Sequence, residues 1–164
     1  MKPFWRERHP PLLLLAASAA ALGIALIAQF GFGLEPCHLC TIQRMPYLFA
    51  ILVAAMASTE VHHDRGRAFL LGFLAAIFAA NIGIAFFHVG VESHWWESAC
   101  SGGETLSTSA GGLLAKLALG KPPPACDSVP FALFGVSIAG MNLIGSAALA
   151  GYAAWSARRA WRHS

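Results

Sequence analysis

Two cysteines separated by two residues, Cys37 and Cys40, are the first feature of the sequence that indicates chemistry. This C-x-x-C spacing lets two sulfurs close a small disulfide ring at a helix start, and such pairs often have lowered thiol pKa values and exchange readily. A c-type haem attachment would need histidine directly after the second cysteine, where Thr41 stands. A redox pair, half of a metal site and an inert structural disulfide remain as interpretations. The redox pair is favoured, because a tetrahedral four-cysteine zinc site would normally use a second short cysteine pair.

The other two cysteines, Cys100 and Cys126, are far apart in the longest hydrophilic segment and make a candidate second pair. A disulfide across an exposed loop is open to a soluble thiolate, because exchange proceeds through a mixed disulfide and depends on access. The alternative interpretation is a structural disulfide that only restrains the loop.

Arg44 follows Cys40 by four residues, which places both on one helical face about one turn apart. An arginine inside a membrane span is costly and indicates a functional site. It could stabilise the Cys40 thiolate, or the anion that forms when a thiolate donates to a quinone ring. The alternative is an arginine that extends its side chain to the membrane interface.

Histidine near these positions is a further candidate. His88, close to the end of the third apolar stretch, could donate a hydrogen bond to a quinone carbonyl or transfer protons. It could equally be a satisfied interfacial residue. His38 inside the C-x-x-C is expected to tune the thiols, and Glu35 and Gln43 are weaker candidates.

The composition predicts the elements that must position these residues. The chain is 57% hydrophobic and 12% charged, whereas soluble domains have about 25% charged residues. Its basic residues stand beside apolar runs, which makes nucleic acid an improbable partner. A membrane span needs about 20 apolar residues. We therefore expect an all-α, integral membrane four-helix bundle as a single domain over residues 1–164, with spans at about 12–34, 41–58, 68–91 and 129–155.

Two of these spans need further argument. The first could be a cleaved signal peptide, but its apolar run continues past the 7–15 residues of a typical signal core, so a retained helix is expected. The second is short when it begins at Met45. Extending it back through residues 41–43 gives a workable span.

The charge pattern predicts the orientation. Of the 11 Lys and Arg residues, eight lie at the N-terminus, at the C-terminus or in the connection at 59–67. Such residues prefer the cytoplasmic side, so both termini are expected there. The segments at about 35–43 and 92–128 then face outward. All four cysteines fall on this outward side, which is oxidising in a bacterium and allows disulfides to persist.

The outward segment 92–128 is expected to have some structure of its own. Its leucines recur at near-helical spacing, which predicts a short amphipathic helix on the membrane surface. Trp95 and Trp96 are expected to anchor the segment at the interface. The leucines concerned are Leu106, Leu113, Leu114 and Leu117.

Taken together, the chain resembles the disulfide bond formation protein B (DsbB) family of bacterial inner-membrane oxidoreductases, from about Leu12 to Trp155. Residues 36–44 match the family pattern Pro-Cys-x-Leu-Cys-x-x-Gln-Arg. Further matches are the segment 88–92, the pair Cys100 and Cys126, and the segment 134–137.

The resemblance implies a quinone-dependent thiol:disulfide oxidoreductase in the inner membrane with its cysteines in the periplasm. It implies reoxidation of a soluble thioredoxin-fold partner, DsbA, with ubiquinone or menaquinone as electron acceptor. Cys37 and Cys40 would be the quinone-proximal pair, with Cys40 in direct interaction with the quinone. Cys100 and Cys126 would meet the partner, with Cys100 forming the mixed disulfide.

By the same resemblance, Arg44 and His88 would be the quinone-site residues.

Two other functions remain open. A membrane thiol reductase would run the reaction in reverse, but no cysteine lies on the cytoplasmic side to receive electrons. A non-enzymatic helical bundle with two structural disulfides is the second alternative.

Overall fold

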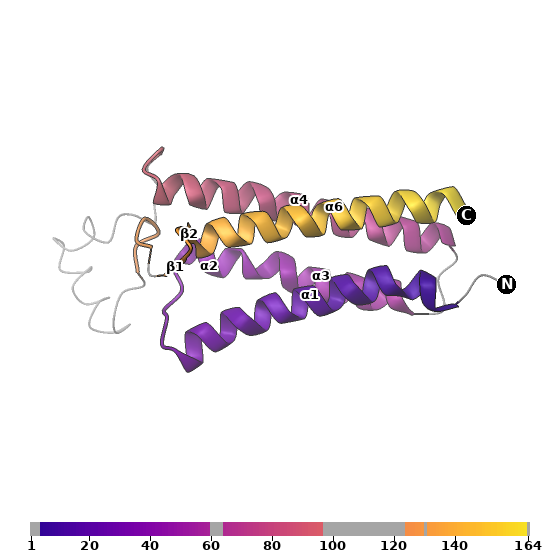
Figure 1. Ribbon diagram of the computed structural model, residues 1–164, viewed down its shortest axis with the longest axis horizontal. Helices are drawn as coiled ribbons and strands as arrows, with labels where there is room; N and C mark the ends of the chain where they lie inside the picture. Colours follow the sequence, from indigo (N-terminus) through magenta and orange to yellow (C-terminus); the bar gives the residue numbers. More distant parts are fainter. Residues whose placement is uncertain (1–3, 60–63, 97–123, 130, 164) are drawn as a thin grey trace, which may run out of the picture.

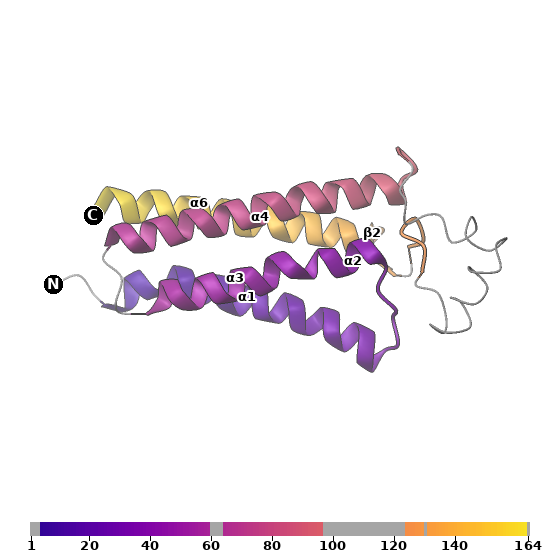
Figure 2. The same ribbon diagram turned by 180° about the vertical axis from the view of Figure 1, so that it is seen from behind.

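The computed structural model describes residues 4–59, 64–96, 124–129 and 131–163, in which four long helical units run side by side (Figures 1 and 2). Each unit is long and apolar enough to cross a membrane. The predicted all-α membrane four-helix bundle is confirmed. The predicted surface helix with Leu106, Leu113, Leu114 and Leu117 lies outside the described residues. The four candidate spans are His9–Gly31, His38–Ser58, Arg65–Glu92 and Ile138–Arg162.

The second span consists of two helices. Helix α2 (His38–Ile42) is followed by Gln43, and helix α3 (Arg44–Ser58) continues in nearly the same direction. The backbone N–H of Gln43 still donates to the carbonyl oxygen of Leu39, so the joint interrupts the helix only slightly. The other long helices are α1 (Phe4–Gly31), α4 (Asp64–Glu92) and α6 (Ile138–His163).

Helix α6 begins later than the predicted start near residue 129, because a short hairpin precedes it. Strands β1 (Ala132–Leu133) and β2 (Val136–Ser137) pair antiparallel. Phe134 and Gly135 form the turn with φ of 53° and 79°, as two-residue hairpins require. The hairpin ends on Ser137, whose hydroxyl accepts a hydrogen bond from the Gly140 N–H at 3.0 Å and so caps α6.

The bundle is built from two closely packed pairs. Helix α4 packs mainly along α6 and helix α1 along α3, and α3 joins the two pairs by contacting α4. Alanines at the contacts allow helix backbones to approach closely, which favours association where lipid is as apolar as the side chains. The buried core consists of Leu14, Tyr47, Ala50, Ala54, Leu71, Leu74, Phe78 and Ala153.

The two ends of the bundle differ. Helix α1 begins and helix α6 ends at one end, whereas α2 and the hairpin lie at the other (Figure 1). Cys37 and Cys40 therefore lie at the end opposite the termini. This end is called the thiol end below.

At the thiol end, Trp96 folds back onto helix α4. Its indole N–H donates to the Phe87 carbonyl oxygen at 3.0 Å, and its ring stacks on the Phe87 ring at 5.6 Å. The Trp96 ring leaves no room for a side chain at Gly90, because a Cβ atom there would lie 2.0 Å from it. Trp95, by contrast, is exposed.

Gly90→Ala is therefore expected to displace Trp96 and to lower the thermal stability of the protein in detergent micelles. Gly83→Ala, on the same helix, is the matched control, because a Cβ atom there meets nothing within 4 Å. Alanine favours a helix over glycine by up to about 1 kcal/mol, so the control is expected to keep or raise the melting temperature. Equal melting temperatures for the two variants would contradict the close packing of Trp96.

Candidate active site

The C-x-x-C is placed by the start of helix α2. The chain arrives extended, and Cys37 takes the N-cap position with φ −69° and ψ 169°. The N-cap side chain normally accepts a hydrogen bond from the first free backbone N–H groups of a helix. Here the Cys37 sulfur accepts from the Cys40 N–H at 3.2 Å. Capping thus folds the two cysteines toward each other, and their sulfurs are 2.6 Å apart.

The two sulfurs are not equivalent. The Cys37 Sγ–H donates to the Cys40 sulfur. This hydrogen bond, together with burial, raises the pKa of the Cys37 thiol to about 12. Cys37 is only 6% exposed, whereas Cys40 is half-buried. In the reduced pair Cys37 therefore keeps its proton, and Cys40 is the more accessible sulfur and the acceptor.

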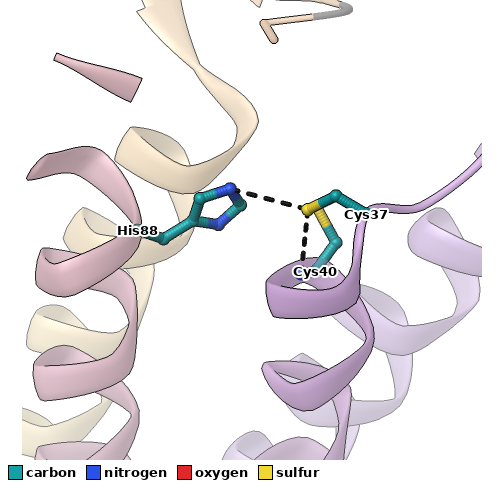
Figure 3. A group of neighbouring side chains, drawn as sticks. All are labelled: Cys37, Cys40 and His88. Atoms are coloured by element: carbon teal, nitrogen blue, oxygen red, sulfur yellow. Dashed lines mark hydrogen bonds between the residues drawn. The ribbon is translucent and has the colours of Figure 1, made fainter. Parts of the chain in front are cut away.

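His88 faces this pair from helix α4. Figure 3 shows its ring pointing at the Cys37 sulfur, and the Nε2–Sγ distance is 3.6 Å. His88 is 2% exposed, so the structure brings this predicted residue to the thiols from a distant part of the sequence. One turn further along α4, a carboxylate oxygen of Glu92 lies 3.8 Å from the same ring nitrogen.

Two residues at this site were underestimated from the sequence. Gln43 was a weaker candidate, yet it is buried and its Nε2 lies 3.1 Å from His88 Nδ1. Glu92 was not predicted as a site residue. Its spacing of four after His88 on a helix was the available signal. The Glu92 carboxylate also accepts a hydrogen bond from the Ser137 hydroxyl at 2.5 Å.

Arg44 is the first residue of α3, about one turn beyond Cys40. Its guanidinium donates to the side-chain oxygen of Gln29 on α1 at 2.5 Å. Gln29 is the strongly polar member of the first apolar stretch, and this hydrogen bond accounts for its presence there. Because a guanidinium carries five N–H donors, Arg44 can bind a further acceptor while it holds Gln29.

Cys126 also belongs to the site. It is 1% exposed and packs in a buried cluster with Cys37, Leu39 and Val91, with Cys40 beside them. The segment that carries Cys126 was expected to be an exposed loop, but Cys126 itself is buried, because the turn that carries it folds onto this apolar cluster. Cys100 lies outside the described residues. Among the other candidates, His38 and Glu35 are exposed.

The same three side chains are also of types that bind metal ions. The sulfurs of Cys37 and Cys40 and a ring nitrogen of His88 lie within 4.8 Å of one another. Two thiolates on one tetrahedral zinc ion, each at about 2.3 Å from it, would be about 3.8 Å apart, and here the sulfurs are closer. The arrangement suits a thiol pair better than a metal centre.

Comparison with known proteins agrees with this chemistry. Residues 7–156 match the family model described as "Disulfide bond formation protein DsbB". A protein of Chromohalobacter salexigens named "Disulfide bond formation protein B" is 31% identical over 150 residues, which cover 87% of this chain and 85% of that protein. A Xanthomonas campestris protein of the same name is 39% identical over 98 residues, covering 56% of this chain and 55% of that protein.

A third protein of that name, from Methylobacillus flagellatus, is 29% identical over 141 residues, covering 84% of each chain. No solved structure matches this chain at a significant level. The family model covers nearly all of the chain, including the C-x-x-C, Arg44, His88 and Cys126. This multi-pass membrane protein, a disulfide oxidoreductase with a role in disulfide-bond formation, belongs to the disulfide bond formation protein DsbB family.

Proposed function

We propose that this protein reoxidises a periplasmic, thioredoxin-fold dithiol oxidase of the DsbA type and passes the electrons to a membrane quinone. Two S–H groups of the partner become one disulfide, and two electrons and two protons reach the quinone. The observation that carries this proposal is the Cys37–Cys40 pair, with sulfurs 2.6 Å apart at a helix start inside a membrane bundle.

The position of Cys126 supports an order for the exchange steps. The partner's thiolate would attack the Cys100–Cys126 disulfide at Cys100 and release Cys126. Cys126 packs in the same buried cluster as Cys37, so it is placed to attack the Cys37–Cys40 disulfide. Each step breaks one S–S bond and forms another, with the electron pair leaving on the displaced sulfur. The inner pair ends as a dithiol.

A quinone is a suitable acceptor for energetic reasons. DsbA has a reduction potential of about −120 mV, whereas cytosolic glutathione lies at about −220 to −260 mV by extraction. A glutathione couple is therefore too reducing to reoxidise such a partner. A quinone supplies a two-electron acceptor that dissolves in the membrane, which would explain why this oxidase is embedded there.

Of the two predicted quinone-site residues, Arg44 is better placed than His88 to donate a hydrogen bond to a quinone carbonyl. Arg44 has N–H donors beyond the one that binds Gln29, and it follows Cys40 by about one helical turn. His88 has both ring nitrogens facing protein groups, Gln43 on one side and Cys37 on the other. We therefore assign the quinone carbonyl to Arg44 and the thiol pair to His88.

The charge pattern and the fold together support one orientation in the membrane. Helix α1 begins and α6 ends at the end opposite the thiols. That end carries the basic residues, so it would face the cytoplasm of the bacterial inner membrane. The thiol end would then face the periplasm.

Quinone reduction by the purified protein, driven by a reduced DsbA-type partner, is the direct test of the proposed reaction. Cys40→Ser and Cys100→Ser are each expected to lower turnover to the uncatalysed background, because exchange needs both sulfurs of both pairs. Each variant must first show wild-type helix content and melting in the same detergent. Full turnover in either folded variant would contradict the oxidase reaction.

Arg44→Leu is expected to raise the KM for a water-soluble short-chain quinone. Hydrogen bonds to charged groups contribute about 1.5–3 kcal/mol, so the expected increase is roughly ten- to a hundredfold, and Arg44→Lys should recover part of it. Arg158→Leu is the matched control, because this exposed arginine lies on α6 at the opposite end. An unchanged KM in Arg44→Leu would make Arg44 an interfacial residue without a role in quinone binding.

Labelling of spheroplasts with a charged, membrane-impermeant maleimide tests the orientation. After mild reduction, Cys100 is expected to react from the outside. A cysteine introduced by Arg158→Cys, at the other end of the bundle, should react only after the membrane is opened. The reverse labelling pattern would show that the protein is inserted the other way round.

A further inference from the structure

A continuous chain of hydrogen bonds leads from the middle of the bundle to the thiol pair. The Tyr47 hydroxyl on α3 donates to Asn142 Oδ1 on α6 at 2.5 Å. The Asn142 amide N–H donates to Gln43 Oε1 at 2.8 Å. Gln43 Nε2 then lies 3.1 Å from Nδ1 of His88 on α4. Four residues from three helices thus connect the core to the active-site histidine.

These hydrogen bonds all run in one direction. The Asn142 oxygen accepts from Tyr47, and at the longer distance of 3.4 Å from Asn81 and Ser146. Asn142 therefore presents its N–H to Gln43. Gln43 uses its oxygen for Asn142 and therefore presents its N–H to His88 Nδ1. A neutral imidazole has one donor and one acceptor nitrogen. With Nδ1 as the acceptor, the proton must be on Nε2.

The other side of the His88 ring agrees with this tautomer. Nε2 faces the Cys37 sulfur at 3.6 Å and a Glu92 carboxylate oxygen at 3.8 Å. An ionised carboxylate accepts hydrogen bonds and donates none, so an N–H on Nε2 suits this side of the ring.

The same direction continues through the two cysteines. Cys37 Sγ accepts from Nε2–H of His88 and from the Cys40 N–H, and its own S–H donates to the Cys40 sulfur. Successive donors in such a chain polarise one another, so each hydrogen bond is strengthened by the one before it. Cys40 is the acceptor at the end.

The side chains that form this series of hydrogen bonds are buried, which argues against an accidental arrangement. Tyr47 is 8% exposed, Gln43 6% and His88 2%. Polar side chains inside a membrane protein are costly, so their retention points to a function or to helix association. The second explanation applies to Asn81 of α4, which donates to Ser146 of α6 at 2.8 Å and reaches Asn142 Oδ1 only at 3.4 Å.

We propose that Tyr47, Asn142 and Gln43 are positioning residues that hold the proton of neutral His88 on Nε2 and thereby make Cys40 the more electron-rich sulfur of the reduced pair. Cys40 would then be the sulfur from which electrons leave. Because the role of the pair in quinone reduction is itself our proposal, the tests below use readouts that do not depend on turnover.

The first test is the tautomer of the wild-type protein. Nitrogen-15 NMR of the full-length protein with labelled histidine distinguishes a protonated Nε2 from a protonated Nδ1. The His88 signals are identified by their loss in His88→Gln. The expected result is a proton on Nε2 in the reduced protein, and a proton on Nδ1 would overturn the proposal.

The second test removes one member of the chain. In Asn142→Leu, Gln43 loses the donor that orients its amide, so His88 should become a mixture of tautomers. The preference of iodoacetamide for Cys40 over Cys37, read by peptide mass spectrometry of the fully reduced protein, should fall about two- to tenfold, the effect of weakening one hydrogen bond. Tyr47→Phe removes a single hydroxyl and should act in the same direction, and it serves if Asn142→Leu fails to fold.

Asn81→Leu is the matched control, because it removes another fully buried amide between α4 and α6. It takes only the longer contact, at 3.4 Å, from Asn142 Oδ1 and leaves the Tyr47 hydroxyl at 2.5 Å to orient Asn142. It should keep both the tautomer and the alkylation preference. If Asn81→Leu changed the alkylation preference as much as Asn142→Leu, these amides would serve only to hold the helices together, and the proposal would be overturned. An unchanged preference in folded Asn142→Leu or Tyr47→Phe would also overturn it. If the wild-type protein has its proton on Nε2 but does not reduce quinone, that result would count against the proposed function alone.

Discussion

The absence of water inside a membrane bundle is the constraint from which most features of this structure follow. A polar side chain there cannot be satisfied by solvent, and an unsatisfied one costs several kcal/mol. Gln43, Tyr47, Asn81 and Asn142 therefore hydrogen-bond across helices to one another or to Ser146. Since each helix can meet these partners in only one rotation, the polar groups specify how α3, α4 and α6 face one another, which apolar packing alone would leave loosely defined.

The same lack of water affects the reactive thiols at the thiol end. Cys37 is placed by a helix start, where a free backbone N–H of α2 is satisfied by its sulfur. Burial makes a charge on Cys37 costly, and the pKa of about 12 reflects that cost together with the hydrogen bond to Cys40. Cys40, one turn of helix away, is less buried than Cys37. Helix capping and burial thus both contribute to the asymmetry between the two thiols.

Helix α1 stands somewhat apart from this arrangement. At the thiol end it diverges from the other three helices (Figures 1 and 2), and the Arg44–Gln29 hydrogen bond connects it to α3 there. A charged donor paired with a neutral amide acceptor keeps its full positive charge. Arg44 is thus oriented without being paired with a carboxylate in this contact, which suits the anion-stabilising role that we propose for it.

The sequence alone determined the four spans and singled out Cys37, Cys40, Arg44 and His88 as candidate site residues, because hydropathy and the C-x-x-C spacing are local properties of the chain. It also drew attention to Gln29 as a polar residue in an apolar run. Only the tertiary structure decided that Gln29 pairs with Arg44, that Cys126 is buried beside Cys37, and that Gln43 and Glu92 contact His88. Those contacts join helices far apart in sequence, and their partners depend on helix rotation, which periodicity within one segment does not specify.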